Sequence, residues 1–152
     1  MLSVSTTQHN AGTHSLWERN RSLSSIGIRY ALPIGAANYA ATFYVMQSGV
    51  TAHALQLWAV YSCKDDPANT VRKKAIAQTA AALPGGTWAA LSSAAVAFPP
   101  SDAPNGCKMT GAAFWVTQVE QGTCGTGTGQ VECPDLFLDD ATIALTTTPP
   151  TD

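Results

Sequence analysis

The chain has 152 residues, a formal net charge of −2 and only 12% charged residues. This length fits one domain and is long enough to bury a core. The chain has no basic stripe, which argues against nucleic acid as a partner. No apolar run approaches the ~18 residues that a membrane span needs. Low charge together with much Ala, Thr, Ser and Gly is typical of secreted β proteins.

The apolar pattern predicts short strands separated by turn residues. In segment 53–62, apolar residues alternate with a second set that contains Gln56 and Trp58 and points to the opposite face. In chain order, the predicted strands cover residues 15–19, 26–32, 39–46, 53–62, 71–82, 87–98, 108–119 and 136–145. The alanines of segment 71–82 would also suit a helix. Short strands with regular turn signals predict an all-β fold, an antiparallel β-sandwich.

Two adjacent aspartates, Asp139 and Asp140, lie inside the last predicted strand. Asp is depleted in strands because its carboxylate competes for backbone hydrogen bonds. Two in succession place one side chain on each face, so one carboxylate points toward the apolar side, where an uncompensated charge is costly. A hard cation such as Ca²⁺ would compensate it with oxygen ligands. The alternative is that the strand bends or ends at the pair and both carboxylates are solvated.

The even number of cysteines predicts disulfides. Cys63, Cys107, Cys124 and Cys133 form no CxxC pair, and the histidines show no ligand spacing, so a zinc site is not expected. Of the possible pairings we favour Cys124–Cys133, which would restrain a flexible loop rich in Gly and Thr, and this leaves Cys63–Cys107. Disulfides imply an oxidising compartment and a secreted, extracellular protein. The alternative is that all the cysteines are reduced and buried in a cytosolic protein.

Short motifs along the chain occur in a recognisable order. They are Ala11-Gly-Thr-His-Ser-Leu16, Asn20-Arg21, Tyr39-Ala-Ala-Thr-Phe-Tyr-Val45, Gly86-Thr-Trp88-Ala-Ala-Leu-Ser92, Phe98-Pro99 and Leu136-Phe-Leu-Asp-Asp-Ala-Thr-Ile143. In order and spacing, this set resembles the carbohydrate-binding modules of families four, nine and twenty-two. The resemblance implies a β-jelly roll over residues 1–145, whose concave sheet holds a polysaccharide of the xylan or β-glucan class.

The resemblance also implies a structural Ca²⁺ near the chain ends, with Asp139 as a ligand. The family opens with an Asn-Gly-x-Phe-Glu strand that has no counterpart here. We therefore expect the N-terminal strand to be missing or divergent and calcium binding to be weak. Residues 146–152 are rich in Thr and Pro and indicate the start of a linker to other domains of a larger chain.

Sugar rings have flat C–H faces that pack on aromatic rings, and their hydroxyls need polar partners. The residues predicted to supply these groups are Arg21, Tyr44, Gln56, Trp58, Trp115 and Glu120. Strand parity places Gln56 and Trp58 on one face. The resemblance favours Arg21, whereas Glu120 is offset from the glutamate expected in its strand. The alternative is that the aromatic residues serve packing and that Arg21 and Glu120 are solvated surface groups.

The sequence offers little support for catalysis. Adjacent carboxylates such as Asp139 and Asp140 cannot stand on both sides of a scissile bond at the ~5–9 Å that glycosidases need. No Gly-x-Ser-x-Gly elbow occurs. We predict a non-catalytic module that binds a neutral polysaccharide with little salt dependence, suited to attachment to a glycoside hydrolase. The alternatives are a structural or adhesion jelly roll, or a capsid or decoration protein, without a glycan ligand.

Overall fold

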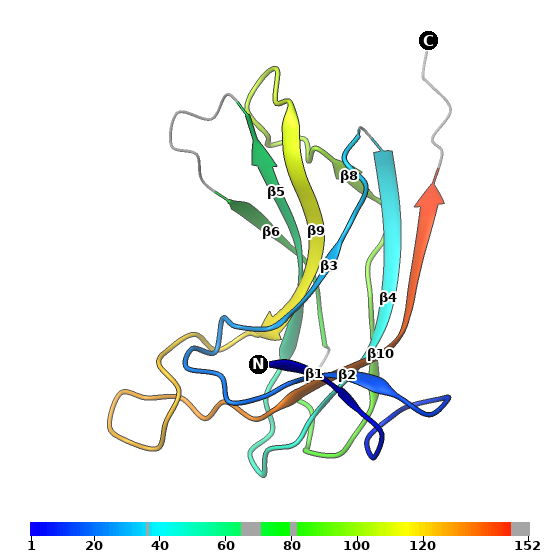
Figure 1. Ribbon diagram of the computed structural model, residues 1–152. Coiled ribbons are helices and arrows are strands. Elements are labelled where there is room, and N and C mark those ends of the chain that lie inside the picture. Colours follow the sequence, from blue (N-terminus) through cyan, green and yellow to red (C-terminus); the bar gives the residue numbers. More distant parts are fainter. Residues whose placement is uncertain (36, 65–70, 80–81, 147–152) are drawn as a thin grey trace.

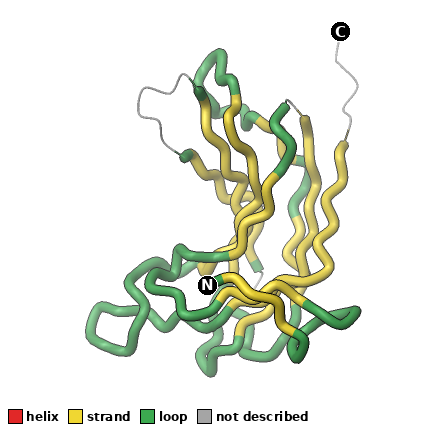
Figure 2. Tube along the Cα trace, in the orientation of Figure 1, coloured by secondary structure: helices red, strands yellow, loops and turns green. Residues whose placement is uncertain are grey.

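The structure, a computed structural model, describes residues 1–35, 37–64, 71–79 and 82–146, and these form strands and loops without a helix (Figure 2). The strands are β1 (Leu2–Ser5), β2 (Ser15–Glu18), β3 (Ile28–Ala31), β4 (Ala37–Gln47), β5 (Leu55–Cys63), β6 (Arg72–Gln78), β7 (Ala89–Ser92), β8 (Val96–Phe98), β9 (Met109–Gln118) and β10 (Leu136–Thr146). The predicted all-β class is confirmed. No helix within these ranges has the length and apolar character of a membrane span.

The strands form two antiparallel sheets that pack face to face (Figure 1). The larger sheet has the order β1-β2-β10-β4-β7, with β8 also paired to β4, and the smaller sheet has the order β3-β9-β5-β6. The last strand, β10, lies between β2 and β4. Along the chain, the strands alternate repeatedly between the two sheets. This arrangement is that of a jelly roll, and the predicted antiparallel sandwich is confirmed.

Aromatic side chains join the two sheets in the core. Phe114 on β9 packs edge-on against Phe43 on β4, with ring centroids 6.0 Å apart, and against Phe98 on β8, at 5.6 Å. All of these rings are buried. The core side of β5 consists of Leu55, Leu57, Ala59, Tyr61 and Cys63, which is the alternation predicted for segment 53–62.

The structure decides one open alternative and differs from the predicted strands in two other places. Segment 71–82, whose alanines also suited a helix, contains the strand β6, because pairing with β5 supplies its hydrogen bonds. Segment 87–98 is two strands rather than one, and between them Ser93 Oγ accepts a hydrogen bond from Ala41 N. The N-terminal strand is present as β1, with a sequence unlike the family's, and pairs with β2. Residues 147–152 of the predicted linker lie outside the described ranges.

Both predicted disulfides are present. Cys63, the last residue of β5, bonds to Cys107, which lies just before β9, and Cys124 bonds to Cys133. The first pair is separated by 44 positions in the sequence and the second by 9. The first bond therefore closes a much longer loop of the unfolded chain.

We expect the two disulfides to differ in their contribution to stability. Cys63→Ala/Cys107→Ala should lower the free energy of unfolding by about 4 kcal/mol and Cys124→Ala/Cys133→Ala by about 2.5 kcal/mol, because a longer released loop gains more entropy. Urea unfolding of each double variant beside the parent measures both values. An equal or larger loss from opening the shorter loop would contradict this ranking.

Candidate functional site

The outward side of the smaller sheet carries two tryptophans next to each other. Trp58 on β5 stands opposite Trp115 on β9, and both side chains are half-buried. Trp58 Nε1 donates a hydrogen bond to Thr117 Oγ1 at 2.9 Å, which orients the indole ring. Residues adjacent to them in sequence, such as Leu57 and Phe114, point into the core. The two tryptophans therefore form an aromatic surface across the central strands of this sheet.

Cationic side chains lie on both sides of the tryptophan pair. Lys73 on β6 places Nζ 4.7 Å from the centroid of Trp58 and 5.6 Å from that of Trp115. Arg29 on β3 stands opposite Trp115, on the other side of β9, and is exposed. Cations over an indole face are attracted by the ring quadrupole. The outward side of β3, β9, β5 and β6, with these four residues and Gln56, is called the concave face below.

A pocket of about 490 Å³ lies against the concave face. It is lined by Ser25, Ile26, Gly27, Arg29, Val60, Val71, Lys73 and Trp115. None of these described lining residues carries a carboxylate. In Figure 1, β9 bows toward the larger sheet, which leaves the outward side of the smaller sheet hollow.

Gly27 allows the wall of this pocket to lie close to the sheet. A Cβ atom at this position would stand 1.9 Å from the carbonyl oxygen of Val116 on β9. Such contact with backbone cannot be relieved by a side-chain rotation, so the position requires glycine. The absence of a side chain at Gly27 thus permits segment 25–27 to line the pocket beside Trp115.

The structure brings some of the predicted ligand residues together and separates others. Trp58, Trp115 and Gln56 share the concave face, with Gln56 opposite Thr117 of β9. Tyr44 does not join them, because it lies on β4 of the larger sheet. Its neighbours Phe43 and Val45 point into the core, so Tyr44 points away from it on the far side of the sandwich. The predicted grouping of Tyr44 with the tryptophans is therefore corrected.

Arg21 was also predicted on the sugar-binding face but is buried, with 6% of its surface exposed. Its guanidinium donates to Pro134 O from both Nε and Nη2, to Ser24 O and Ile26 O from Nη1, and to Gln118 Oε1 from Nη2. All its N–H donors are thus used within the protein. Burial lowers the pKa of Arg21 to about 10, and the negative charges of Asp135 and Glu18 oppose this shift. Arg21 is a structural clamp between loops and β9, and remains charged at neutral pH.

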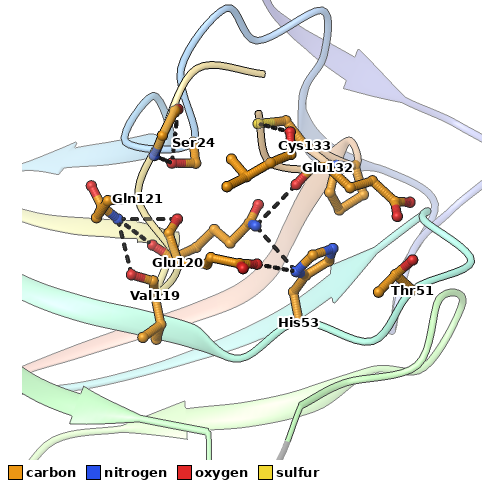
Figure 3. Close-up of polar contacts among 12 residues, drawn as sticks. Ser24, Thr51, His53, Val119, Glu120, Gln121, Glu132 and Cys133 are labelled. Atoms are coloured by element: carbon orange, nitrogen blue, oxygen red, sulfur yellow. Dashed lines mark hydrogen bonds and ion pairs between the residues drawn. The ribbon is translucent and has the colours of Figure 1, made fainter. Parts of the chain in front are cut away.

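Glu120 lies beyond the end of β9 and pairs with a buried histidine (Figure 3). Its Oε2 atom is 3.2 Å from His53 Nδ1, and most of the Glu120 side chain is exposed. Gln118 Nε2 also contacts His53 Nδ1, at 3.1 Å, and donates to the carbonyl oxygen of Glu132. This network joins the disulfide loop to β9. Glu120 is therefore not part of the concave face, contrary to its predicted grouping.

The aspartate pair interrupts β10 with a bulge. The register with β4 shifts between Asp139 and Thr142, and Asp140 has a φ of 45°, so the strand bends there. Asp139 Oδ2 accepts hydrogen bonds from the backbone N–H groups of Asn10 and Ala11, at 2.7 and 3.1 Å. Asp140 Oδ2 accepts from the side-chain amide of Asn10 at 2.8 Å. The carboxylates are thus compensated by N–H donors.

This arrangement does not fit the predicted calcium ion. Ca²⁺ takes six or more oxygen ligands, whereas the groups directed at Asp139 Oδ2 are N–H donors. Among the described residues, no three His, Cys, Asp or Glu side chains are grouped closely enough to hold a metal. An ion at Asp139 would have to displace the amide contacts that already compensate its charge.

No protein-family model and no curated protein sequence matches this chain. Solved structures do match it. The CBM22-1–GH10 modules of Clostridium thermocellum xylanase 10B, solved with xylohexaose, share 21% identity and a TM-score of 0.68 over 97% of this chain and 25% of that one. The CBM22-2 xylan-binding domain of Paenibacillus barcinonensis Xyn10C shares 17% identity and a TM-score of 0.70 over 96% of this chain and 87% of that one.

The CBM22-1–CBM22-2 tandem of the same Paenibacillus barcinonensis protein has a TM-score of 0.75 at 17% identity, over 96% of this chain and 43% of that one. At these identities the likeness establishes the fold. The chain thus has the jelly roll of the CBM22 domains, as the sequence resemblance predicted. It spans a quarter of the xylanase chain and less than half of the tandem.

The sequence pattern does not identify Lys73 or Arg29 as site residues. The pairing of β6 with β5 contains a register shift between Leu57 and Trp58, so counting alternate residues could not assign Lys73 to a face. A lysine on an edge strand also serves to block edge-to-edge association. Only the contact of Lys73 with both indole rings connects it to the site.

The structural role of Arg21 can be tested by a charge-conserving change. We expect Arg21→Lys to lower the free energy of unfolding by about 3 kcal/mol, because a single ammonium leaves several buried acceptors unpaired. The exposed Arg29→Lys is the matched control and should stay within about 0.5 kcal/mol of the parent. Urea unfolding measures both. Parent-like stability of Arg21→Lys would contradict the clamp.

Proposed function

We propose that this chain is a non-catalytic carbohydrate-binding module that holds a polysaccharide on the concave face. The observation that carries the proposal is the Trp58–Trp115 pair, which lies side by side on a hollow sheet surface next to a pocket. Flat aromatic surfaces of this kind match the apolar C–H faces of sugar rings. Gln56, on the same face, offers an amide that both donates and accepts hydrogen bonds to hydroxyls.

The chemistry of the concave face supports binding without hydrolysis. Cleavage of a glycosidic bond by the common mechanism needs two carboxyl groups that flank it. Within the described part of the chain, the residues that line the pocket include no Asp or Glu. Glu120 is engaged with His53 at the end of the sheet, and Asp139 and Asp140 belong to the larger sheet.

The proposed ligand class is xylan, with β-glucan as the wider class to be tested beside it. Support for xylan comes from the fold neighbours, which are described as xylan-binding domains. One of those neighbours is joined to a GH10 module, so attachment to a glycoside hydrolase within a longer chain is part of the proposal. The two disulfides support a secreted protein, since such bonds persist in oxidising compartments.

Removing one tryptophan should weaken polysaccharide binding strongly. We expect Trp58→Ala and Trp115→Ala each to cost about 2 kcal/mol of binding free energy, or roughly 30-fold in affinity, because central aromatic anchors dominate small interfaces. Gln56→Ala should cost about 1 kcal/mol or less, since neutral hydrogen bonds exchange with water. Affinity gels with soluble xylan and β-glucan measure these losses.

Tyr44→Ala is the matched control for these variants, because Tyr44 is an aromatic residue that points outward from the opposite sheet. It should retain the affinity of the parent. If both tryptophan variants stay folded and bind as well as the parent, the ligand does not use the concave face. Loss of binding in Tyr44→Ala would instead locate the ligand on the larger sheet.

The calcium ion that the sequence predicts can be tested by its effect on the melting temperature. A bound ion would raise the melting temperature with the logarithm of its concentration above Kd. Because Asp139 already accepts hydrogen bonds from Asn10 and Ala11, we expect equal melting temperatures in excess Ca²⁺ and in excess chelator. A concentration-dependent rise in Ca²⁺, absent in Asp139→Asn, would show that the ion displaces these contacts.

A further inference from the structure

We infer that the concave face prefers a polysaccharide that carries carboxylate groups, such as uronate side units, over the same polysaccharide without them. This inference rests on the proposed function and narrows its ligand class. It departs from the neutral ligand expected from the sequence. The juxtaposition that carries it is a pair of cations, Lys73 and Arg29, on either side of an aromatic sugar-stacking surface.

The pocket carries a local positive charge. Lys73 and Arg29 both line the pocket, and none of the described residues in its lining is acidic. Among the described residues, neither of these two cations forms a salt bridge. The neighbouring Lys74 does form one, with its Nζ atom 3.8 Å from Asp102 Oδ1. The protein as a whole has a formal net charge of −2. The positive charge at the pocket is therefore local, and no carboxylate of the described residues forms a salt bridge with it.

The two cations belong to strands on opposite sides of the strands that carry the tryptophans. In the sheet register, Trp115 lies between Arg29 on β3 and Trp58 on β5. Lys73 on β6 pairs with Val60, which lies two residues after Trp58 on β5. Three interstrand steps of about 4.8 Å separate β3 from β6, or roughly 14 Å. A sugar chain that stacks on both tryptophans crosses the strands and therefore extends toward Arg29 in one direction and toward Lys73 in the other. Substituents on the units next to the stacked ones can reach one of the two cations.

Stacking of a sugar on the tryptophans changes the contacts of Lys73. Its ammonium lies over both indole rings, so a stacking sugar must displace it. With a neutral sugar, the cation–π attraction is lost and no anion replaces it. With a uronate, the displaced ammonium gains a carboxylate partner within reach. Arg29 can bind a second carboxylate through two parallel N–H···O bonds. The site therefore discriminates against the uncharged ligand and in favour of the charged one.

A matched pair of ligands tests this directly. One is a glucuronate-substituted xylan, and the other is the same preparation after chemical reduction of its carboxyl groups to alcohols. We expect the acidic form to bind about tenfold more tightly at low ionic strength, which corresponds to about 1.4 kcal/mol. Because exposed charges are screened within about 3 Å at 1 M salt, the preference should largely disappear there. Isothermal titration at both salt concentrations measures it.

Charge-removing variants assign the preference to the two cations. Lys73→Met and Arg29→Gln should each reduce the tenfold preference to about threefold. Lys73→Met should bind the reduced xylan at least as well as the parent, because the indole faces are no longer covered. Lys74→Met removes the same charge from the adjacent residue, which pairs with Asp102, and should keep the full preference. Thermal melting confirms that each variant is folded.

The possible failures are distinguishable. Equal affinity of the parent for the acidic and the reduced xylan overturns this inference and leaves the proposed function in place. An equal loss of preference in Lys74→Met and Lys73→Met also overturns it, because the effect would then arise from general charge. If the parent binds neither form, the proposed function fails and this inference fails with it.

Discussion

The antiparallel register of β5 and β9 determines both the core and the candidate binding surface of this protein. These strands pair along most of their length, and Trp58 stands opposite Trp115. Side chains alternate between the faces of a strand, so a slip of one residue would exchange the two sets. Leu57 would leave the core if β5 slipped and Phe114 if β9 slipped, and either would be a large hydrophobic loss. The burial of one face thus fixes the tryptophan pair on the other, without any contribution from a ligand.

Arg21 connects the smaller sheet to the loops that lie at the end of that sheet where β9 ends. Burial of a charge is costly unless every donor finds an acceptor. Here the acceptors come from three separate segments, at Ser24 and Ile26, at Gln118 of β9, and at Pro134 beyond the disulfide loop. The segment that contains Ser24 and Ile26 continues into the wall of the pocket. Arg21 therefore stabilises the loop that forms one wall of the pocket, although its own side chain does not reach the concave face.

The sequence predicts the fold class and part of the site for a clear physical reason. A strand such as β5, buried on one face only, shows its orientation in the alternation of apolar residues, and this was enough to group Gln56 with Trp58. Tyr44 could not be placed in this way, because parity within a strand does not reveal to which sheet the strand belongs. Arg21 could not be interpreted either, since its partners are backbone carbonyls from distant segments, which leave no pattern in the sequence. Lys73 was hidden by the register shift between β5 and β6.

The central claim is that carbohydrate binds on the concave face, and the indole N–H resonances of the four tryptophans provide its most direct test. Two of them, Trp58 and Trp115, lie on the concave face, whereas Trp17 on β2 stacks with Phe137 in the larger sheet. Trp88 precedes β7 of that same sheet. In a nuclear magnetic resonance titration with xylohexaose, we predict that the Trp58 and Trp115 signals shift together with one saturation curve, while those of Trp17 and Trp88 stay in place. Shifts confined to Trp17 or Trp88 would contradict the account, as would no shift in any indole at saturating ligand.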